Sequence, residues 1–356
     1  MIFYLGGLLK NYFGPARLLQ SYAVLIVLAL YLGFWITRKF LPRFYPLLPT
    51  DRGREFTLSK EVSKGKPTGA GVVFITIFVV LSLLFIPLDS LQCGILIQTW
   101  LMMLTGFLDD RSKGGWGEYR KALLDLVITL AASLLLAHYL PQNYQDGKLF
   151  FWLPFTTQHL FLPKWLYIVI STVMLWISVN TTNCTDGVDG LSSSLVLIAL
   201  FTMGSIFYII LGHVDISAYL LLPHIADGAS WGLMTFCLAG ILMGYLWHNA
   251  FPSSVLMGDA GSRALGFYIG VCVMVSGNPF MFLATSSIIF INGGMGLLKV
   301  ALKRFFHISI LEKIRFPLHD HFRKNHGWSP TQVLLKFLII QLLITVAMLG
   351  VFFKVR

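Results

Sequence analysis

The feature that most constrains this sequence is its series of long apolar runs, separated by short polar segments. Several of these runs reach ~18 residues or more, the length that a helix needs to cross the hydrocarbon core of a bilayer. Only 12% of the 356 residues are charged and 56% are hydrophobic, whereas soluble proteins are about 25% charged. Backbone groups inside a bilayer must find their partners within the chain, which favours helices. The sequence therefore predicts an all-α polytopic membrane protein.

About ten transmembrane helices can be placed, with boundaries good to a few residues. An even number of spans puts both termini on the same side of the membrane. Residues 1–356 are interpreted as a single integral membrane domain. The predicted spans cover residues 18–37, 69–87, 91–108, 121–140, 164–180, 190–211, 230–248, 264–276, 280–300 and 331–352.

The basic residues predict the orientation. The loops after the odd-numbered spans hold 19 Lys and Arg, among them Arg263, whereas the opposite loops hold only Lys148 and Lys164. The positive-inside rule makes the first set of loops cytoplasmic and places both termini outside. The net charge of +11 then reflects loops beside spans, where cytoplasmic lipid attracts basic residues. No nucleic-acid partner is expected.

An acidic pair, Asp109 and Asp110 in "GFLDD", follows the third span on the predicted cytoplasmic face. Two adjacent carboxylates repel each other, so one keeps its proton unless a cation lies close. Such a pair suits a metal site or acid/base chemistry on phosphate. A solvated helix end is the plainer alternative.

A second acidic motif, "NCTDGVDG", follows the fifth span. It places Asn183, Asp186 and Asp189 three residues apart, so that on a helical turn they would share one face. The alternative is structural: Asp189 precedes the next apolar run and could cap its helix. Helix N-termini also favour anionic ligands, so the two interpretations are compatible.

Two further polar segments lie on the same predicted face. "HNAFPSSVLMGDAGS" carries Asn249 and Asp259, the latter in a turn between glycines ahead of the eighth span. Hard oxygen ligands suit Mg²⁺, which often bridges phosphate oxygens, and no His/Cys spacing indicates zinc. "FPLHDHF" carries His319, Asp320 and His321 among basic residues, a composition that fits binding of phosphate or a sugar.

In chain order, "GFLDD", "NCTDGVDGL", "HNAFPSSVLMGDAGSRALG" and "FPLHDHF" resemble the phospho-N-acetylmuramoyl-pentapeptide-transferase family, a branch of the polyprenyl-phosphate N-acetylhexosamine-1-phosphate transferases. The resemblance extends over nearly the whole chain. It implies transfer of phospho-N-acetylmuramoyl-pentapeptide from its UDP-linked donor to undecaprenyl phosphate, which releases UMP and forms lipid I in peptidoglycan synthesis. It also implies Mg²⁺ dependence, a homodimer, and a place in the bacterial inner membrane with the active site in cytoplasmic loops.

The same resemblance implies roles for individual residues. Asp259 matches the metal ligand, and Asp109 and Asp110 match an acidic pair that acts as base, nucleophile or metal neighbour. His319, at the start of the family's histidine run, is expected to be catalytic. The implied substrate-binding residues are Lys64, Thr68, Lys121, Asn183, Asp186, Asp189, Asn249, Leu256 and His321.

Three positions depart from the family pattern. The run of three histidines reads His319-Asp320-His321, and an acid in its middle would repel phosphate unless it binds a sugar hydroxyl or pairs with a nearby arginine. Leu256 stands where the family usually has an aromatic residue that stacks on uracil. Lys66 replaces a usual threonine.

Two other functions remain as alternatives. A transferase that uses UDP-N-acetylglucosamine has the same chemistry with a smaller donor. An ion-coupled transporter would use the acids as a relay, but transporter sites lie near the middle of the membrane on broken helices of repeated halves, whereas these acids lie at span ends. For the muramoyl transferase itself, two mechanisms are open. Either the phosphate of the lipid attacks the donor directly, or an aspartate attacks first and forms a covalent phospho-sugar enzyme.

Overall fold

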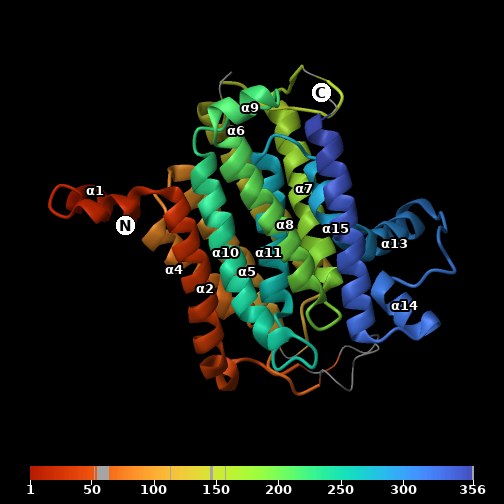
Figure 1. The fold of residues 1–356 in the computed structure, drawn as a ribbon. Coiled ribbons are helices and arrows are strands. Elements are labelled where there is room, and N and C mark those ends of the chain that lie inside the picture. The colour runs from red at the N-terminus through yellow and green to blue at the C-terminus, as the bar shows by residue number, and fades with distance from the viewer. Residues whose placement is uncertain (52, 54–63, 113, 145–146, 157, 355–356) are drawn as a thin grey trace.

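The computed structural model describes residues 1–51, 53, 64–112, 114–144, 147–156 and 158–354, and helices dominate it (Figure 1). The first half contains α1 (Ile2–Leu9), η1 (Gly14–Gln20), α2 (Tyr22–Phe44), η2 (Tyr45–Leu47), α4 (Gly71–Phe85), α5 (Ser90–Arg111), α6 (Glu118–Asn143), and the two-stranded antiparallel β1 (Phe150–Phe151) and β2 (Leu160–Phe161). The second half contains α7 (Lys164–Thr185), α8 (Leu191–Ser205), η3 (Ile206–Leu211), α9 (Val214–Tyr219), α10 (Gly228–Asn249), α11 (Gly258–Val275), α12 (Met281–Ile289), η4 (Phe290–Gly294), α13 (Met295–Phe306), α14 (Leu318–His326) and α15 (Pro330–Lys354).

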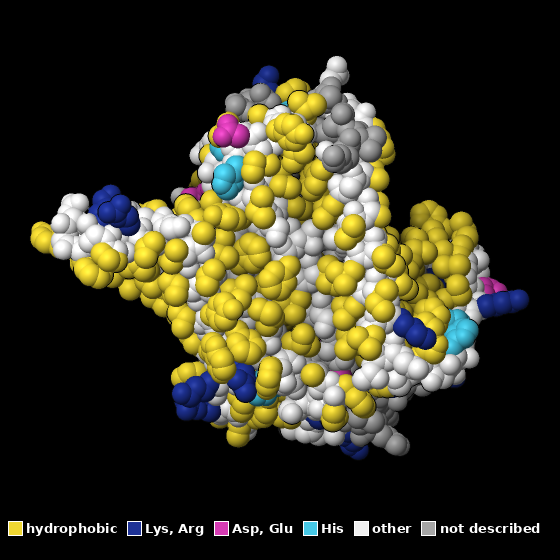
Figure 2. Space-filling model, viewed as in Figure 1, with side chains coloured by type: hydrophobic (Ala, Val, Ile, Leu, Met, Phe, Trp, Pro, Cys, Tyr) yellow, Lys and Arg dark blue, Asp and Glu magenta, His cyan; other side chains and the backbone are white. Residues whose placement is uncertain are grey.

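The membrane-protein class is confirmed. Eight helices within the described residues are long and apolar enough to cross a membrane. Each of the ten predicted spans coincides with helical structure, but α4 has only 15 residues and α11 is not among the eight. Figure 2 shows hydrophobic side chains covering the middle of one face, with Lys and Arg at its periphery, toward the top and bottom and on the segments that project to either side. The count of ten spans stays a prediction.

Helix α11 forms the centre of the bundle. All of its residues are buried, and α5 and α7 pack against it. The approach to α7 is close, because a Cβ at Gly266 would lie only 2.5 Å from the Ser178 carbonyl oxygen. The span predicted at residues 264–276 is therefore wrong at its start: the helix begins at Gly258, and Asp259 lies in its first turn rather than in a loop.

The span predicted at residues 280–300 is not one straight helix. It consists of α12, a π-helical turn η4, and α13, and Figure 1 shows α13 directed away from the bundle. The helical backbone is interrupted at Ser286, whose φ of −140° and ψ of 24° are not helical. In η4, Gly293 allows close packing on α7, because a Cβ on it would lie 2.4 Å from the Thr181 carbonyl oxygen. A π-helical turn such as η4 is a usual site of a helix kink.

A polar cluster joins α5 and α10 at the end of the bundle away from Arg111. Asp89 caps α5 by accepting the Gln92 N–H at 2.7 Å. Asp227, which precedes α10, accepts hydrogen bonds from the Trp231 indole at 2.7 Å and from the Gln92 amide at 3.3 Å. Burial, and then the charge of Asp89, raise the pKa of Asp227 to about 7.

This cluster predicts a pH-dependent stability. The pKa of Asp227 is about 7 when folded and ~3.9 in an unfolded chain. Between these values the folded state holds a proton that the unfolded state has lost, so a rise in pH from about 4 to about 7 should lower the free energy of unfolding, by at most ~4 kcal/mol. Thermal unfolding in detergent across this interval would measure the effect. Asp227→Asn, which stays neutral, should remove it; an unchanged pH dependence in that variant would contradict the assignment.

Candidate active site

The acidic pair of α5 meets the start of α11. Both carboxylate oxygens of Asp110 accept backbone hydrogen bonds, from Asp259 at 3.0 Å and from Ala260 at 3.1 Å. The first N–H groups of a helix have no partner within it, and a negative charge there is favourable. Asp110 therefore joins the end of α5 to the beginning of α11.

Two glycines allow this junction. Gly258 has φ of +67°, and a Cβ on it would lie 2.3 Å from the Asp110 carboxylate. A Cβ on Gly106 of α5 would lie 2.4 Å from the Asp259 carbonyl oxygen. Residues with side chains would therefore separate the two helices and move the carboxylates apart.

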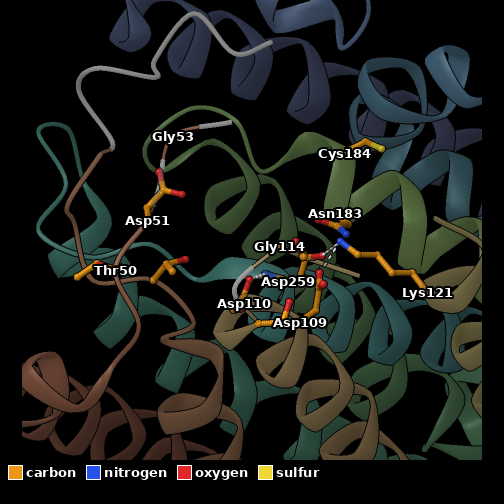
Figure 3. Close-up of a pocket in the computed structure, with 13 residues that line it drawn as sticks. Thr50, Asp51, Gly53, Asp109, Asp110, Gly114, Lys121, Asn183, Cys184 and Asp259 are labelled. Carbon is orange, nitrogen blue, oxygen red and sulfur yellow. Dashed lines mark hydrogen bonds and ion pairs between the residues drawn. The ribbon is translucent and has the colours of Figure 1, made fainter. Parts of the chain in front are cut away.

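A cation lies between two of the carboxylates. The Lys121 ammonium, in the first turn of α6, donates to Asp259 Oδ2 at 3.0 Å and also pairs with Asp109 Oδ2 (Figure 3). Asp109 and Asp259 are buried, whereas the Lys121 side chain is 30% exposed. Asp109 also accepts the Trp116 N–H at 2.6 Å. Of the acidic pair predicted from the sequence, Asp109 therefore has the nearby cation, Lys121, whereas Asp110 is held by backbone N–H groups of α11.

These three residues face a cavity of about 430 Å³ (Figure 3). Asn183, in the last turn of α7, borders it and accepts the Ser262 hydroxyl at 3.3 Å. The other walls come from distant segments and include Thr50, Asp51, Gly53, Thr68, Asp110, Ser112, Gly114, Gly115 and Cys184.

A second cavity of about 250 Å³ adjoins the first. Asp51, Thr68 and Cys184 line both, so the two form one continuous site. Residues that line only the second cavity are Asp186, Gly187, Val188, Asp189, Asn249, Leu256, Gly258, Pro317, His319 and Asp320.

Asp189 is held by the chain that follows α10. Its carboxylate accepts the Ser253 N–H at 3.0 Å and lies 3.6 Å from the Lys66 ammonium. The capping alternative for Asp189 is wrong: Gly190 precedes α8, in the left-handed conformation, without a side-chain cap. The departure at Lys66 thus supplies a counter-charge for Asp189.

Asn249 fixes the neighbouring turns. Its carbonyl oxygen accepts the Gly190 N–H at 3.0 Å and the Ser193 hydroxyl at 3.1 Å, and its amide donates to the Val255 carbonyl at 3.0 Å. It borders the second cavity, but these contacts use its side chain to connect the start of α8 with the end of α10.

Helix α14 contributes His319 and Asp320. His319 is buried, its Nδ1 lies 3.1 Å from the Asn292 amide nitrogen, and burial lowers its pKa to about 3, so it is neutral at ordinary pH. Burial raises the pKa of Asp320, while Arg315 and Arg323 oppose this shift. Asp320 lies 3.9 Å from the Arg323 guanidinium, which is the pairing that would offset its repulsion of phosphate.

Two predicted substrate-binding residues lie outside these cavity walls. His321 accepts the Arg315 N–H at 3.2 Å and is not among the lining residues of either cavity. Lys64 is exposed and borders neither cavity. Their substrate contacts stay predictions.

Asp51 and Cys184, which line both cavities, were not predicted as site residues from the sequence. Cys184 lies inside "NCTDG", so the motif itself was the signal. Asp51 is placed at the site by an isolated antiparallel β-bridge between Thr50 and Pro67. No local sequence pattern indicates that pairing.

The donor set is compatible with a magnesium ion. The described residues contain no cluster of three or more His, Cys, Asp or Glu that could hold a metal. Mg²⁺, however, is usually held by one or two carboxylates together with substrate phosphates and water. Asp109 and Asp259 are two buried carboxylates that already converge on one positive charge, that of Lys121. Asp259 is the residue that would hold Mg²⁺, with the Asp109 carboxylate beside it.

Comparison with known proteins identifies the family. Residues 92–277 match the family model described as "Glycosyl transferase family 4". The chain is 55% identical over 348 residues to the phospho-N-acetylmuramoyl-pentapeptide-transferase of Treponema pallidum (strain Nichols), which covers 98% of this chain and 95% of that protein. Proteins of the same name from Campylobacter hominis and from Helicobacter pylori (strain HPAG1) are each 30% identical, over 89% and 94% of this chain and 90% and 96% of their own. The chain therefore belongs to the phospho-N-acetylmuramoyl-pentapeptide-transferase family.

Proposed function

We propose that this protein transfers phospho-N-acetylmuramoyl-pentapeptide from its UDP-linked donor to undecaprenyl phosphate, releasing UMP and forming lipid I. The family membership supports the reaction. The observation that carries it is the convergence of Asp109, Lys121 and Asp259, from three different helices, on one cavity. Two anionic substrates that react at phosphorus need such an arrangement of charge.

We also propose a topology. The protein crosses the bacterial inner membrane ten times, with both termini outside and the site facing the cytoplasm, where UDP-linked donors are made. The excess of Lys and Arg on the predicted cytoplasmic loops supports this orientation. A homodimer is expected from the family, and the molecular mass in detergent would test it.

In this proposal each cavity binds one end of the UDP-linked donor. The diphosphate faces Lys121 in the first cavity, and Asn183 borders the sugar phosphate there. The uridine side lies in the second cavity, where Leu256 contacts the base without stacking and Asp186 and Asp189 accept from hydroxyl or ring N–H groups. Loss of the aromatic contact at Leu256 lowers the affinity for the base unless another residue replaces it.

Mg²⁺, held by Asp259 with Asp109 beside it, would neutralise phosphate charge and polarise the bond to UMP. Lys121 provides the protein's own positive charge at the same place. The rate enhancement then comes mainly from positioning and from charge stabilisation at the transferred phosphorus.

The acid pair has divided roles in this mechanism. Asp110 is engaged by two backbone N–H groups and orients α11. Both acids border the cavity, but the two oxygens of Asp110 are engaged by backbone groups, so Asp109 is the better group to take a remaining proton from the lipid phosphate as that phosphate attacks directly. His319 stays neutral and borders the uridine side. Trapping a labelled phospho-sugar on the protein in the absence of lipid acceptor would defeat the direct mechanism.

One assay tests the function. UMP release is measured with UDP-N-acetylmuramoyl-pentapeptide or UDP-N-acetylglucosamine, each with and without undecaprenyl phosphate. Release that needs both the muramoyl donor and the lipid supports the proposal. UMP release with the N-acetylglucosamine donor indicates the alternative transferase. If neither donor gives UMP, the transferase proposal fails and the transporter hypothesis remains.

A further inference from the structure

A buried ion pair lies within the membrane bundle, outside the cavity walls. Arg263 of α11 pairs with Asp125 of α6, and their side chains are 1% and 2% exposed. Arg263 was assigned to a cytoplasmic loop from the sequence; that placement is wrong, because α11 already begins at Gly258. Ionisable side chains buried in a membrane-spanning bundle are costly and usually functional.

This pair is one helical turn from the catalytic charges. Asp125 follows Lys121 by four residues on α6, and Arg263 follows Asp259 by four residues on α11. Four residues advance a helix by ~6 Å and return to the same face. The two helices are thus joined by two ion pairs, Lys121–Asp259 and Asp125–Arg263, of opposite polarity.

Opposite polarity makes the register specific. A slip of one turn in one direction would bring Asp125 against Asp259, and a slip in the other would bring Lys121 against Arg263. Each mismatch places like charges together between largely buried side chains, where repulsion is stronger than in water. Only the observed register satisfies both pairs.

Stability alone does not account for the pair. Within the described residues, Arg263 Nε and Nη1 are buried without a hydrogen-bond partner. Buried donors left unsatisfied are destabilising, and apolar replacements of buried ion pairs are often neutral or stabilising. Arg263 also neutralises Asp125, whose carboxylate would otherwise compete for the Lys121 ammonium.

We propose that Asp125 and Arg263 are positioning residues, which set the register of α6 on α11 and keep the Lys121 ammonium between Asp109 and Asp259. The role rests on the proposed function, because the position of Lys121 matters for the transfer of a diphosphate-linked sugar. Neither Asp125 nor Arg263 touches the substrate; they act through Lys121.

The test compares two double variants of the full-length protein in detergent. Asp125→Leu/Arg263→Met removes both charges, and Asp125→Arg/Arg263→Asp keeps an ion pair but reverses its polarity. We expect both variants to fold, the apolar one with an unchanged or higher unfolding midpoint. In both, kcat for UMP release should fall on the order of 10–100-fold with little change in KM, as misplaced catalytic groups do. Arg263→Lys, which keeps the charge, should retain most of kcat.

A matched control separates register from general charge effects. Glu118→Gln removes a 92% exposed carboxylate at the start of the same helix and should leave kcat unchanged. A wild-type kcat in either double variant would overturn the proposal, as would a loss of kcat that only parallels a lowered unfolding midpoint. If only the polarity-reversed variant fails to fold, kcat of the apolar variant decides whether the proposal holds. If wild-type protein releases no UMP, the proposed function itself fails, whereas effects confined to the variants concern only this pair.

Discussion

Asp259→Asn should reduce kcat for UMP release on the order of 10³-fold while leaving the fold intact. The Asp259 carboxylate is 2% exposed and contacts the Lys121 ammonium at 3.0 Å. Asparagine has the same shape and keeps the backbone N–H that Asp110 accepts, so the junction of α5 and α11 should survive. What is lost is the negative charge that would hold Mg²⁺, and electrostatic terms of this kind are usually the largest in catalysis.

The measurement is UMP release with muramoyl donor and undecaprenyl phosphate over a range of Mg²⁺ concentrations. The thermal unfolding midpoint in detergent serves as the control for folding. Near-normal turnover of Asp259→Asn with Mg²⁺ would show that the metal assignment is wrong.

Lys121→Met should be almost as damaging, with a loss of kcat of roughly 10²–10³-fold. The substitution keeps most of the length of the side chain and removes only the ammonium. Asp109 and Asp259 would then face each other without the cation that now pairs with both, and one of them would be driven to bind a proton. The same change also removes a positive charge from the cavity that receives the diphosphate.

The adjacent residue provides the control for this variant. Arg120 is exposed, and its guanidinium stacks over the Trp116 ring at 3.9 Å instead of bordering the cavity. Arg120→Gln removes one positive charge from the same helical turn and should change kcat by less than about twofold. An equal loss in both variants would indicate that only the overall charge of the surface matters, contrary to a specific role for Lys121.

The general architecture was predictable because hydrophobic length and charge asymmetry are properties of the sequence itself. Apolar runs predicted helices that the structure has, and the family motifs predicted that acids far apart in the chain belong together. Asp109 and Asp259 illustrate this, since they come from α5 and α11 and contact the same ammonium. Their chemical roles stay predictions for the assays above.

Features set by long-range packing were not predictable. Arg263 looks like a loop residue in the sequence because its partner, Asp125, lies 138 positions away. The early start of α11 depends on Asp110, which satisfies N–H groups of another helix. The packing of η4 depends on the close approach of Thr181 from α7. In each case the cause is a contact between segments that no local pattern records.

The complete burial of α11 has a consequence for how the chain enters the membrane. Charged residues oppose insertion of an isolated helix, by about 3 kcal/mol where they lie at its centre, and α11 carries Asp259 in its first turn and Arg263 in its second. Its charge partner is on α6, and α5, α6 and α7 all precede it during synthesis. The helices that precede α11 therefore already hold the partner of its buried charge, and we expect insertion of α11 to depend on the order in which the segments leave the ribosome.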